Sequence, residues 1–369
     1  MDLIFFNKMN LNTLYTKALN LESLSSDEGA FLYRNAPPSE LFDTAQRVRF
    51  IHVPEKKVSW QIDRNINYTN VCISGCLFCN FHCTVSQKDK SYTTSTEEYR
   101  IKIEELRALG GDQILLQGGL HPGYDITFYE NLFFELKSID PEIKLNALGP
   151  PEVAHIARIS KISIEETLHR LVRAGLTTLP GAGAEILSDR VRKIISPAKP
   201  NTQKWCEVMR AAHKMGLSTT ATMVYGHIET IEERMEHLVT IREIQSDKPS
   251  DAPGFRAFIS WPMQMEGTKL SQIYSGKDIT PVEHLKMVAM SRIMLNNIPH
   301  IQASWLTVGE ATGQMALHCG ADDMGSIMIE ENVVSSAGAN YRMGSEEMQR
   351  RIKETGFEPW LRGQDYLPR

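Results

Sequence analysis

Short runs rich in apolar and β-branched residues alternate with amphipathic segments from about residue 60 onward. This alternation is the pattern of βα units arranged around a parallel sheet. The eight runs with the length and composition of strands are residues 61–68, 113–117, 144–148, 176–179, 218–224, 255–261, 301–305 and 326–329. Eight such units predict an α/β fold of the (β/α)8 TIM-barrel type. The alternative is an open barrel of six units, in which the last two runs are not strands.

The segments between these runs carry signals for the starts of helices. Ser95 with Glu98, and Ser163 with Glu166, have the spacing of a capping box. Apolar side chains recur at helical spacing through residues 230–246, with charged side chains on the other face. These signals support helices between the predicted strands.

The chain divides into three predicted regions. Residues 1–55 read as an N-terminal helical cap, interrupted by Pro37 and Pro38. Residues 56–340 form the barrel, and residues 341–369 form a C-terminal helix and a short tail packed on the barrel.

Composition and charge narrow the class of partner. The net charge of -5 gives no overall basic field that would attract nucleic acid or an anionic membrane surface. No apolar run approaches the roughly 20 residues of a membrane-spanning helix. The N-terminus lacks the pattern of a secretory signal, which predicts a cytoplasmic protein. We therefore expect a small-molecule substrate, with no nucleic acid and no membrane as partner.

The strongest chemical signal is a group of cysteines directly after the first predicted strand. Cys72, Cys76 and Cys79 are spaced C-x3-C-x2-C, and Cys83 follows. In a parallel barrel this loop lies at the mouth, where active sites are built. Three thiolates can hold a [4Fe-4S] cluster and leave one iron open to another ligand. The alternative is a zinc site that uses Cys83 as a fourth ligand.

This spacing, with Phe78 before the third cysteine, resembles the cluster motif of the radical S-adenosylmethionine (SAM) superfamily. The resemblance implies that Cys72, Cys76 and Cys79 bind a [4Fe-4S] cluster, that SAM binds the open iron, and that Phe78 lies against the adenine. It also implies a low-potential electron donor such as flavodoxin or ferredoxin.

Other segments match further parts of the SAM site in this superfamily. The turn at Gly118 and Gly119 resembles the one that meets the amino group of SAM. Glu185 follows the fourth predicted strand, where a carboxylate can accept hydrogen bonds from ribose hydroxyls. Val224 and Gly226 lie in a segment that resembles the one backing the adenine. Arg192 is a candidate to pair with a carboxylate of SAM or substrate.

A narrower resemblance runs from about residue 60 to residue 341. The segments that carry it are residues 67–70, 117–122, 149–152, 181–185, 225–227, 301–305 and 330–334. They look like those of the cyclic dehypoxanthine futalosine synthases of menaquinone biosynthesis. The relatives of that family, aminofutalosine synthase and the deazaflavin-cofactor synthases, are alternatives, and a non-enzymatic iron-sulfur or zinc-binding protein is an alternative of another class.

The resemblance implies an oxidative cyclisation of a nucleoside-like substrate. A radical derived from SAM removes a hydrogen atom from ribose, and the carbon radical closes onto an aromatic ring. His227 and His121 follow predicted strands and are candidates for the base that accepts the proton.

Four residues near the last two predicted strands are candidates for contact with the substrate. They are Gln302, Ser304, Trp305 and Asp323. The indole of Trp305 can stack on an aromatic ring. Alternate residues of a barrel strand face opposite sides, so only one parity of residues 301–305 faces the interior.

Overall fold

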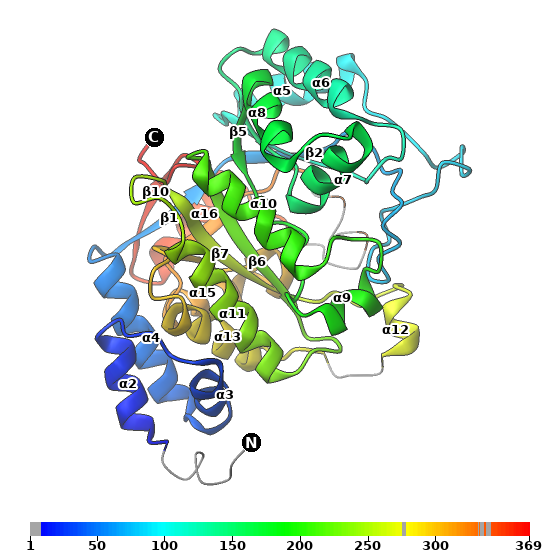
Figure 1. The fold of residues 1–369 in the computed structure, drawn as a ribbon. Helices are drawn as coiled ribbons and strands as arrows, with labels where there is room; N and C mark the ends of the chain where they lie inside the picture. Colours follow the sequence, from blue (N-terminus) through cyan, green and yellow to red (C-terminus); the bar gives the residue numbers. More distant parts are fainter. Residues whose placement is uncertain (1–8, 275–277, 331, 333–335, 337–340) are drawn as a thin grey trace.

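A curled parallel sheet forms the centre of the molecule (Figure 1). The computed structural model describes residues 9–274, 278–330, 332, 336 and 341–369. Within these residues the sheet has ten strands in the order β10-β1-β9-β8-β7-β6-β5-β4-β3-β2. They are β1 (Lys57–Gln61), β2 (Asp63–Asn67), β3 (Gln113–Gln117), β4 (Lys144–Ala147), β5 (Leu176–Leu179), β6 (Ser218–Tyr225), β7 (Gly254–Pro262), β8 (His300–Gln302), β9 (Asp323–Ser326) and β10 (Glu358–Leu361).

The sheet curls into a barrel because β1 and β2 form one bent strand, with Ile62 between them. Gln61 at the end of β1 pairs with Ser326 of β9, whereas all of β2 pairs with β3, from Asp63 to Asn67. A single register pair joins β8 to β9, so the barrel is only partly closed there. With β1 and β2 counted together, and β10 added outside the barrel, the predicted arrangement of eight parallel strands is confirmed.

Three details of the predicted strands were wrong. The eighth strand is Asp323–Ser326, three residues earlier than expected, because its acidic start is buried by partners elsewhere in the chain. The seventh ends at Gln302, and Trp305 instead begins a short helix. The tail contains a strand, β10, in which Pro359 is tolerated because the strand lies at the edge of the sheet.

Helices cover the outside of the barrel. The described helices are α2 (Leu11–Leu19), α3 (Ser26–Asn35), α4 (Pro38–His52), α5 (Thr96–Ala108), α6 (Ile126–Ile139), α7 (Pro150–Ser160), α8 (Ile164–Ala174), α9 (Asp189–Ile195), α10 (Thr202–Lys214), α11 (Ile231–Ser246), α12 (Leu270–Ile273), α13 (Pro281–Met294), α14 (Trp305–Val308), α15 (Glu310–Ala316) and α16 (Ser345–Glu354). The Ser95 and Glu98 capping box forms as predicted, with both reciprocal hydrogen bonds. At Ser163 only the hydrogen bond from the Glu166 amide is made. No described helix is long and apolar enough to cross a membrane.

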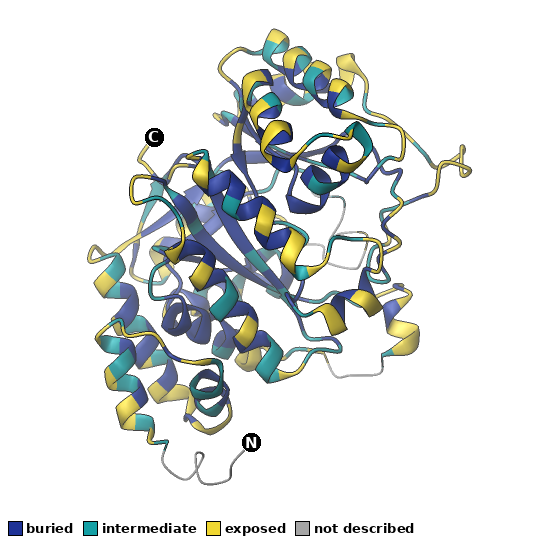
Figure 2. Ribbon diagram, viewed as in Figure 1, coloured by how far each residue is buried: buried dark blue, intermediate teal, exposed yellow. Residues whose placement is uncertain are grey.

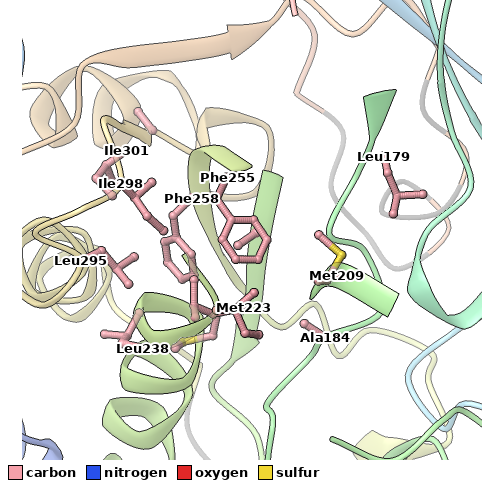
Figure 3. Close-up of a cluster of buried hydrophobic side chains, with 14 of the residues drawn as sticks. Leu179, Ala184, Met209, Met223, Leu238, Phe255, Phe258, Leu295, Ile298 and Ile301 are labelled. Atoms are coloured by element: carbon pink, nitrogen blue, oxygen red, sulfur yellow. The ribbon is translucent and has the colours of Figure 1, made fainter. Parts of the chain in front are cut away.

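The N-terminal helices pack on one side of the barrel. Helix α4 lies against α13, and α3 lies against α11 (Figure 1). The inward faces of the helices and the strands are buried, and the outward faces are exposed (Figure 2). Between the sheet and its covering helices, Phe255 and Phe258 of β7 pack with Met223, Leu238 and Ile298 (Figure 3). This apolar layer holds the strands in place and leaves their other faces to line the interior of the barrel.

The C-terminal tail closes the barrel at the amino ends of the strands. Arg362 directly follows β10 and is only 2% exposed. Its Nε lies 2.5 Å from a carboxylate oxygen of Asp323 at the start of β9. The rings of Tyr366 and His300 are stacked, with 4.2 Å between their centroids. The Arg362 guanidinium also contacts Tyr366 and lies 3.8 Å from the centroid of its ring. The tail thus forms a floor, opposite the cysteine loop at the carboxyl end of β2.

Candidate functional site

The loop after β2 brings three of its cysteines to one cavity. Cys72, Cys76 and Cys79 line a space of about 220 Å³, which we call the cysteine cavity. The main-chain amides of Ser74 and Leu120 donate to the Cys72 sulfur over 3.4 Å and 3.3 Å. Amide hydrogen bonds of this kind stabilise a thiolate and tune the potential of a cluster bound to it. The loop therefore favours a thiolate at Cys72, whereas burial raises the pKa of the Cys76 thiol to about 11.

Gly118 and Gly119 allow the turn after β3 to lie directly against this loop. A Cβ atom added to Gly119 would be 2.2 Å from the Val71 carbonyl oxygen and 2.9 Å from the Cys72 Cβ. One added to Gly118 would be 2.8 Å from the ring of Tyr68. The Gly119 amide donates to the Thr69 carbonyl over 2.8 Å. Glycine is thus required for the close approach of the two segments, and both glycines line the cysteine cavity.

Cys83 supports the loop through its backbone. Its amide donates to the Asn70 carbonyl, and its carbonyl accepts from the Cys72 amide, each over 2.9 Å. Cys83 is buried and is not among the residues that line the cysteine cavity. In the described part of the chain, no three His, Cys, Asp or Glu side chains lie close enough to hold one metal ion. Three thiols spread around one cavity fit a cluster with separate irons better than a single zinc ion.

A buried ion cluster lies beside the cysteine cavity. The Lys199 ammonium lies 2.6 Å from the Glu185 carboxylate and 5.5 Å from the centroid of the Phe78 ring. Burial opposes the charged form of Lys199, but Cys76 and Glu185 hold its pKa well above the ordinary value. Burial likewise opposes ionisation of Glu185, but Lys199 and Arg192 hold its pKa below the ordinary value. Glu185 is therefore a buried anion paired with two cations. It is not among the residues that line the cysteine cavity, and its contact with ribose stays a prediction.

Arg192 binds the main chain of the loop that follows β5. This arginine is 2% exposed. Its guanidinium donates to the carbonyls of Gly183 and Ala184 over 3.2 Å and 2.5 Å, and to the Pro200 carbonyl over 2.7 Å. These main-chain partners occupy the side chain, so its contact with a carboxylate of SAM or substrate stays a prediction.

Glu152 lines the cysteine cavity and was missed by reasoning from the sequence. It lies in the first turn of α7, just after the carboxyl end of β4, and is 7% exposed. Burial raises its pKa to about 7. The signal that was available is its position, since an acidic residue at the carboxyl end of a barrel strand faces the active-site mouth.

The segment after β6 is held together by His227. This imidazole has Nε2 3.0 Å from the Val224 carbonyl and Nδ1 3.0 Å from the Glu229 carboxylate. Gly226 has a φ of +93° and donates its amide to Glu229 over 2.6 Å. Neither His227 nor Val224 lines the cysteine cavity. The role of His227 as a base and the adenine contacts of Val224 and Gly226 stay predictions, and the structure gives His227 two internal partners.

His121 is also placed beside the cysteine cavity without lining it. Its ring is stacked 3.7 Å from that of Tyr124, and its Nδ1 accepts from the Gly123 amide over 3.1 Å. Burial, with a smaller effect of His155, lowers its pKa. Its role as a base stays a prediction.

A second cavity of about 250 Å³ occupies the interior of the barrel, and we call it the lumen cavity. Its lining includes Asn65, Gln117, Asn146, Thr222, Trp261 and Gln302. Alternate residues contribute, such as 63 and 65 on β2 or 259 and 261 on β7, as expected for one face of each strand. Gln117, Ala182 and Gly183 line both cavities. The lumen cavity therefore lies directly against the cysteine cavity.

Of the four residues predicted to contact substrate, the structure places only Gln302 on the lumen cavity. Ser304 donates to the Ser260 carbonyl over 2.6 Å. Trp305 belongs to the apolar core, and its indole donates to the Ser326 carbonyl over 3.2 Å. Asp323, as described above, is paired with the arginine of the tail. The contacts of Ser304, Trp305 and Asp323 with substrate stay predictions that this placement does not favour.

Trp261 lines the lumen cavity and was not singled out in the sequence. It lies two residues from Ile259 on β7, and both side chains face the interior. Side chains alternate between the two faces of a strand, and this alternation along β7 was the signal that could have identified Trp261 as a lumen residue. The residues 331, 333 and 334 of the predicted family segment lie outside the described residues.

Two family models match the chain. The model of the radical SAM superfamily matches residues 66–241, and the model of the CofH/MqnC C-terminal region matches residues 252–369. The cyclic dehypoxanthine futalosine synthase of Streptomyces coelicolor is 41% identical over 362 residues, which cover 97% of this chain and 89% of the relative. The chain belongs to the CofH/MqnC family of radical SAM enzymes. Such enzymes use a [4Fe-4S] cluster and SAM to act on a small-molecule substrate, and the cysteine and lumen cavities suit those groups.

Other relatives show how broad this family is. The 5-amino-6-(D-ribitylamino)uracil–L-tyrosine 4-hydroxyphenyl transferase 1 of Methanosarcina mazei is also 41% identical, over 319 residues that cover 85% of this chain and 82% of the relative. Among solved structures, methylornithine synthase matches with a TM-score of 0.71 and 18% identity, covering 94% of this chain and 97% of that chain. This structural likeness shows a shared fold.

Proposed function

We propose that the chain is a cyclic dehypoxanthine futalosine synthase, which closes a ring in its nucleoside-like substrate by oxidative cyclisation. The extent of the sequence match supports this reaction. The synthases of Streptomyces coelicolor and of Halalkalibacterium halodurans match 97% of this chain, at 41% and 38% identity. The hydroxyphenyl transferase of Methanosarcina mazei matches 85%. By this proposal the enzyme acts in menaquinone biosynthesis.

The observation that carries the proposal is the contact between the two cavities. A single substrate in the lumen cavity reaches the cysteine cavity past Gln117, Ala182 and Gly183, which line both. An intramolecular cyclisation needs one substrate held in one conformation, with the reacting atoms close together. The lumen cavity of about 250 Å³, closed at its floor by the tail, has room for no more than one substrate molecule.

We propose that Cys72, Cys76 and Cys79 hold the cluster and that Gly118, Gly119 and the paired Glu185 shape the SAM site. When bound, the cluster and SAM supply the one-electron chemistry that removes a hydrogen atom from the substrate. A low-potential electron donor such as flavodoxin or ferredoxin is the proposed protein partner.

The cyclisation also releases a proton, and we propose Glu152, which lines the cysteine cavity, as its acceptor. Its carboxyl group faces the cysteine cavity, and a pKa of about 7 suits a general base at neutral pH. We therefore place Glu152 ahead of His227 and His121 for this role.

A hydroxyphenyl transfer is the second candidate function, because the Methanosarcina mazei transferase has the same 41% identity as the Streptomyces coelicolor synthase, over a shorter part of the chain. One experiment separates the two. The anaerobically reconstituted enzyme is incubated with SAM, reductant and dehypoxanthine futalosine, and in parallel with tyrosine and 5-amino-6-(D-ribitylamino)uracil. We expect a product lighter than dehypoxanthine futalosine by a pair of hydrogen atoms, detected by mass spectrometry. Product in the tyrosine reaction alone would overturn the proposal.

A further inference from the structure

The surface of the lumen cavity is mostly apolar, and the polar side chains set into it are nearly all uncharged amides and hydroxyls. Among its described lining residues only Asp63 and Arg362 carry a formal charge, and both lie at the floor. The Asp63 carboxylate accepts from Gln61 over 3.0 Å and from the Ser326 hydroxyl. The Arg362 guanidinium is engaged by Asp323. A ligand in the lumen therefore meets amides and hydroxyls rather than a free charge.

Two side-chain polar atoms of this lining are fully buried and have no hydrogen-bond partner within the described residues. They are Oδ1 of Asn65 and Nε1 of Trp261. Asn65 is 4% exposed. Its neighbour Asn146 differs, because Asn146 Oδ1 accepts from the Thr178 hydroxyl over 2.8 Å. Buried polar atoms without a partner destabilise a protein, and at a cavity wall a ligand can supply the missing hydrogen bond.

We propose that Asn65 and Trp261 are substrate-positioning residues that hydrogen-bond the hydroxyl groups of a neutral sugar in the lumen cavity. A hydroxyl group accepts from the indole N–H and donates to the amide oxygen, so one class of group satisfies both atoms. They lie on strands on different sides of the barrel, β2 and β7, and the two contacts fix the orientation of the sugar. This inference rests on the proposed function, since it takes the sugar to be that of the nucleoside-like substrate.

The test uses two variants and one matched control in the reconstituted holoenzyme. Trp261→Phe keeps an aromatic ring and removes the N–H, and Asn65→Leu keeps a similar volume and removes the polar atoms. Asn297→Leu is the control, because Asn297 also has a buried amide oxygen without a partner and donates to the Arg242 carbonyl over 2.9 Å, away from the lumen. Binding of dehypoxanthine futalosine is measured by anaerobic equilibrium dialysis without reductant, and turnover is measured with reductant.

We expect the dissociation constant to rise about tenfold in each lumen variant, as for the loss of one hydrogen bond, with Tm unchanged or higher. The Asn297→Leu control should show a lower Tm and a dissociation constant within about twofold of wild type. Suppose that the wild-type enzyme binds and converts dehypoxanthine futalosine, and that both lumen variants bind it as tightly as wild type does. That result would overturn this inference and leave the proposed function standing. A fall in Tm without loss of affinity would mean that the two residues are structural, which also overturns it. A wild-type enzyme that neither binds nor converts dehypoxanthine futalosine would overturn the proposed function and this inference together.

Discussion

Gly119→Ala is the substitution whose effect on the cysteine loop can be worked out most fully. The added methyl group would lie 2.2 Å from the Val71 carbonyl oxygen and 2.6 Å from its carbon. Real Cβ atoms do not approach backbone atoms this closely, so one of the two segments must move. The next nearest atom is the Cβ of Cys72, at 2.9 Å, so the movement displaces a proposed cluster ligand.

The size of the effect follows from these contacts. Forcing an extra methyl group into a packed site costs roughly 1–3 kcal/mol, and here the obstacle is backbone, which cannot rotate away. The loss of conformational freedom in the unfolded chain offsets about 0.4–1 kcal/mol. We expect a net destabilisation of about 1–2 kcal/mol, together with a shift of the loop that weakens cluster binding.

The assay compares Gly119→Ala with Gly123→Ala, a matched control in the same loop. A methyl group at Gly123 would meet only the His121 ring at 3.5 Å, an ordinary van der Waals contact. After anaerobic reconstitution, iron and sulfide per chain should fall by at least half in Gly119→Ala and match wild type in Gly123→Ala. Full iron content and wild-type Tm in Gly119→Ala would refute the argument from close approach.

Two further substitutions test the buried charges. Glu152 has a pKa of about 7, raised from 4.5, so the folded chain binds more protons between those values and loses stability as the pH rises through that window. Relative to Glu152→Gln, wild type should lose about 3 kcal/mol between pH 4.5 and 8, measured by urea denaturation. A difference in unfolding free energy between wild type and Glu152→Gln that is the same at pH 4.5 and pH 8 would contradict this prediction. Arg362→Met leaves the Asp323 carboxylate buried without its cation, which should cost about 3–5 kcal/mol, whereas Arg350→Met at the surface should leave Tm close to that of wild type. Equal Tm values for these two variants would show that the tail does not depend on the buried pair.

The sequence allowed the barrel and the cysteine motif to be predicted because both depend on local signals. Strands such as 113–117 and 176–179 have the expected bounds, since each is a short β-rich run between a helix end and a loop. The spacing of Cys72, Cys76 and Cys79 is likewise a local pattern, and the structure brings all three to one cavity.

The errors occurred where distant partners decide the structure. Asp323 looked like a loop residue, but Arg362, 39 residues later, neutralises it and lets β9 begin there. Trp305 was expected to lie in the seventh strand, but that strand ends at Gln302 and the Trp305 indole joins the apolar core. The tryptophan that lines the lumen is Trp261 of β7. The position of Glu152 just after β4 could have been read from the sequence, but its burial, which raises its pKa, depends on other segments of the chain.

The most direct test of the account measures iron in single alanine variants of the four clustered cysteines, purified and reconstituted without oxygen. We expect about four irons per chain and reductive cleavage of SAM in wild type and in Cys83→Ala. Alanine at Cys72, Cys76 or Cys79 should abolish the cleavage and most of the iron. Wild-type iron and SAM cleavage in Cys76→Ala, or zinc in place of iron in wild type, would contradict the proposal that these three thiolates hold the cluster.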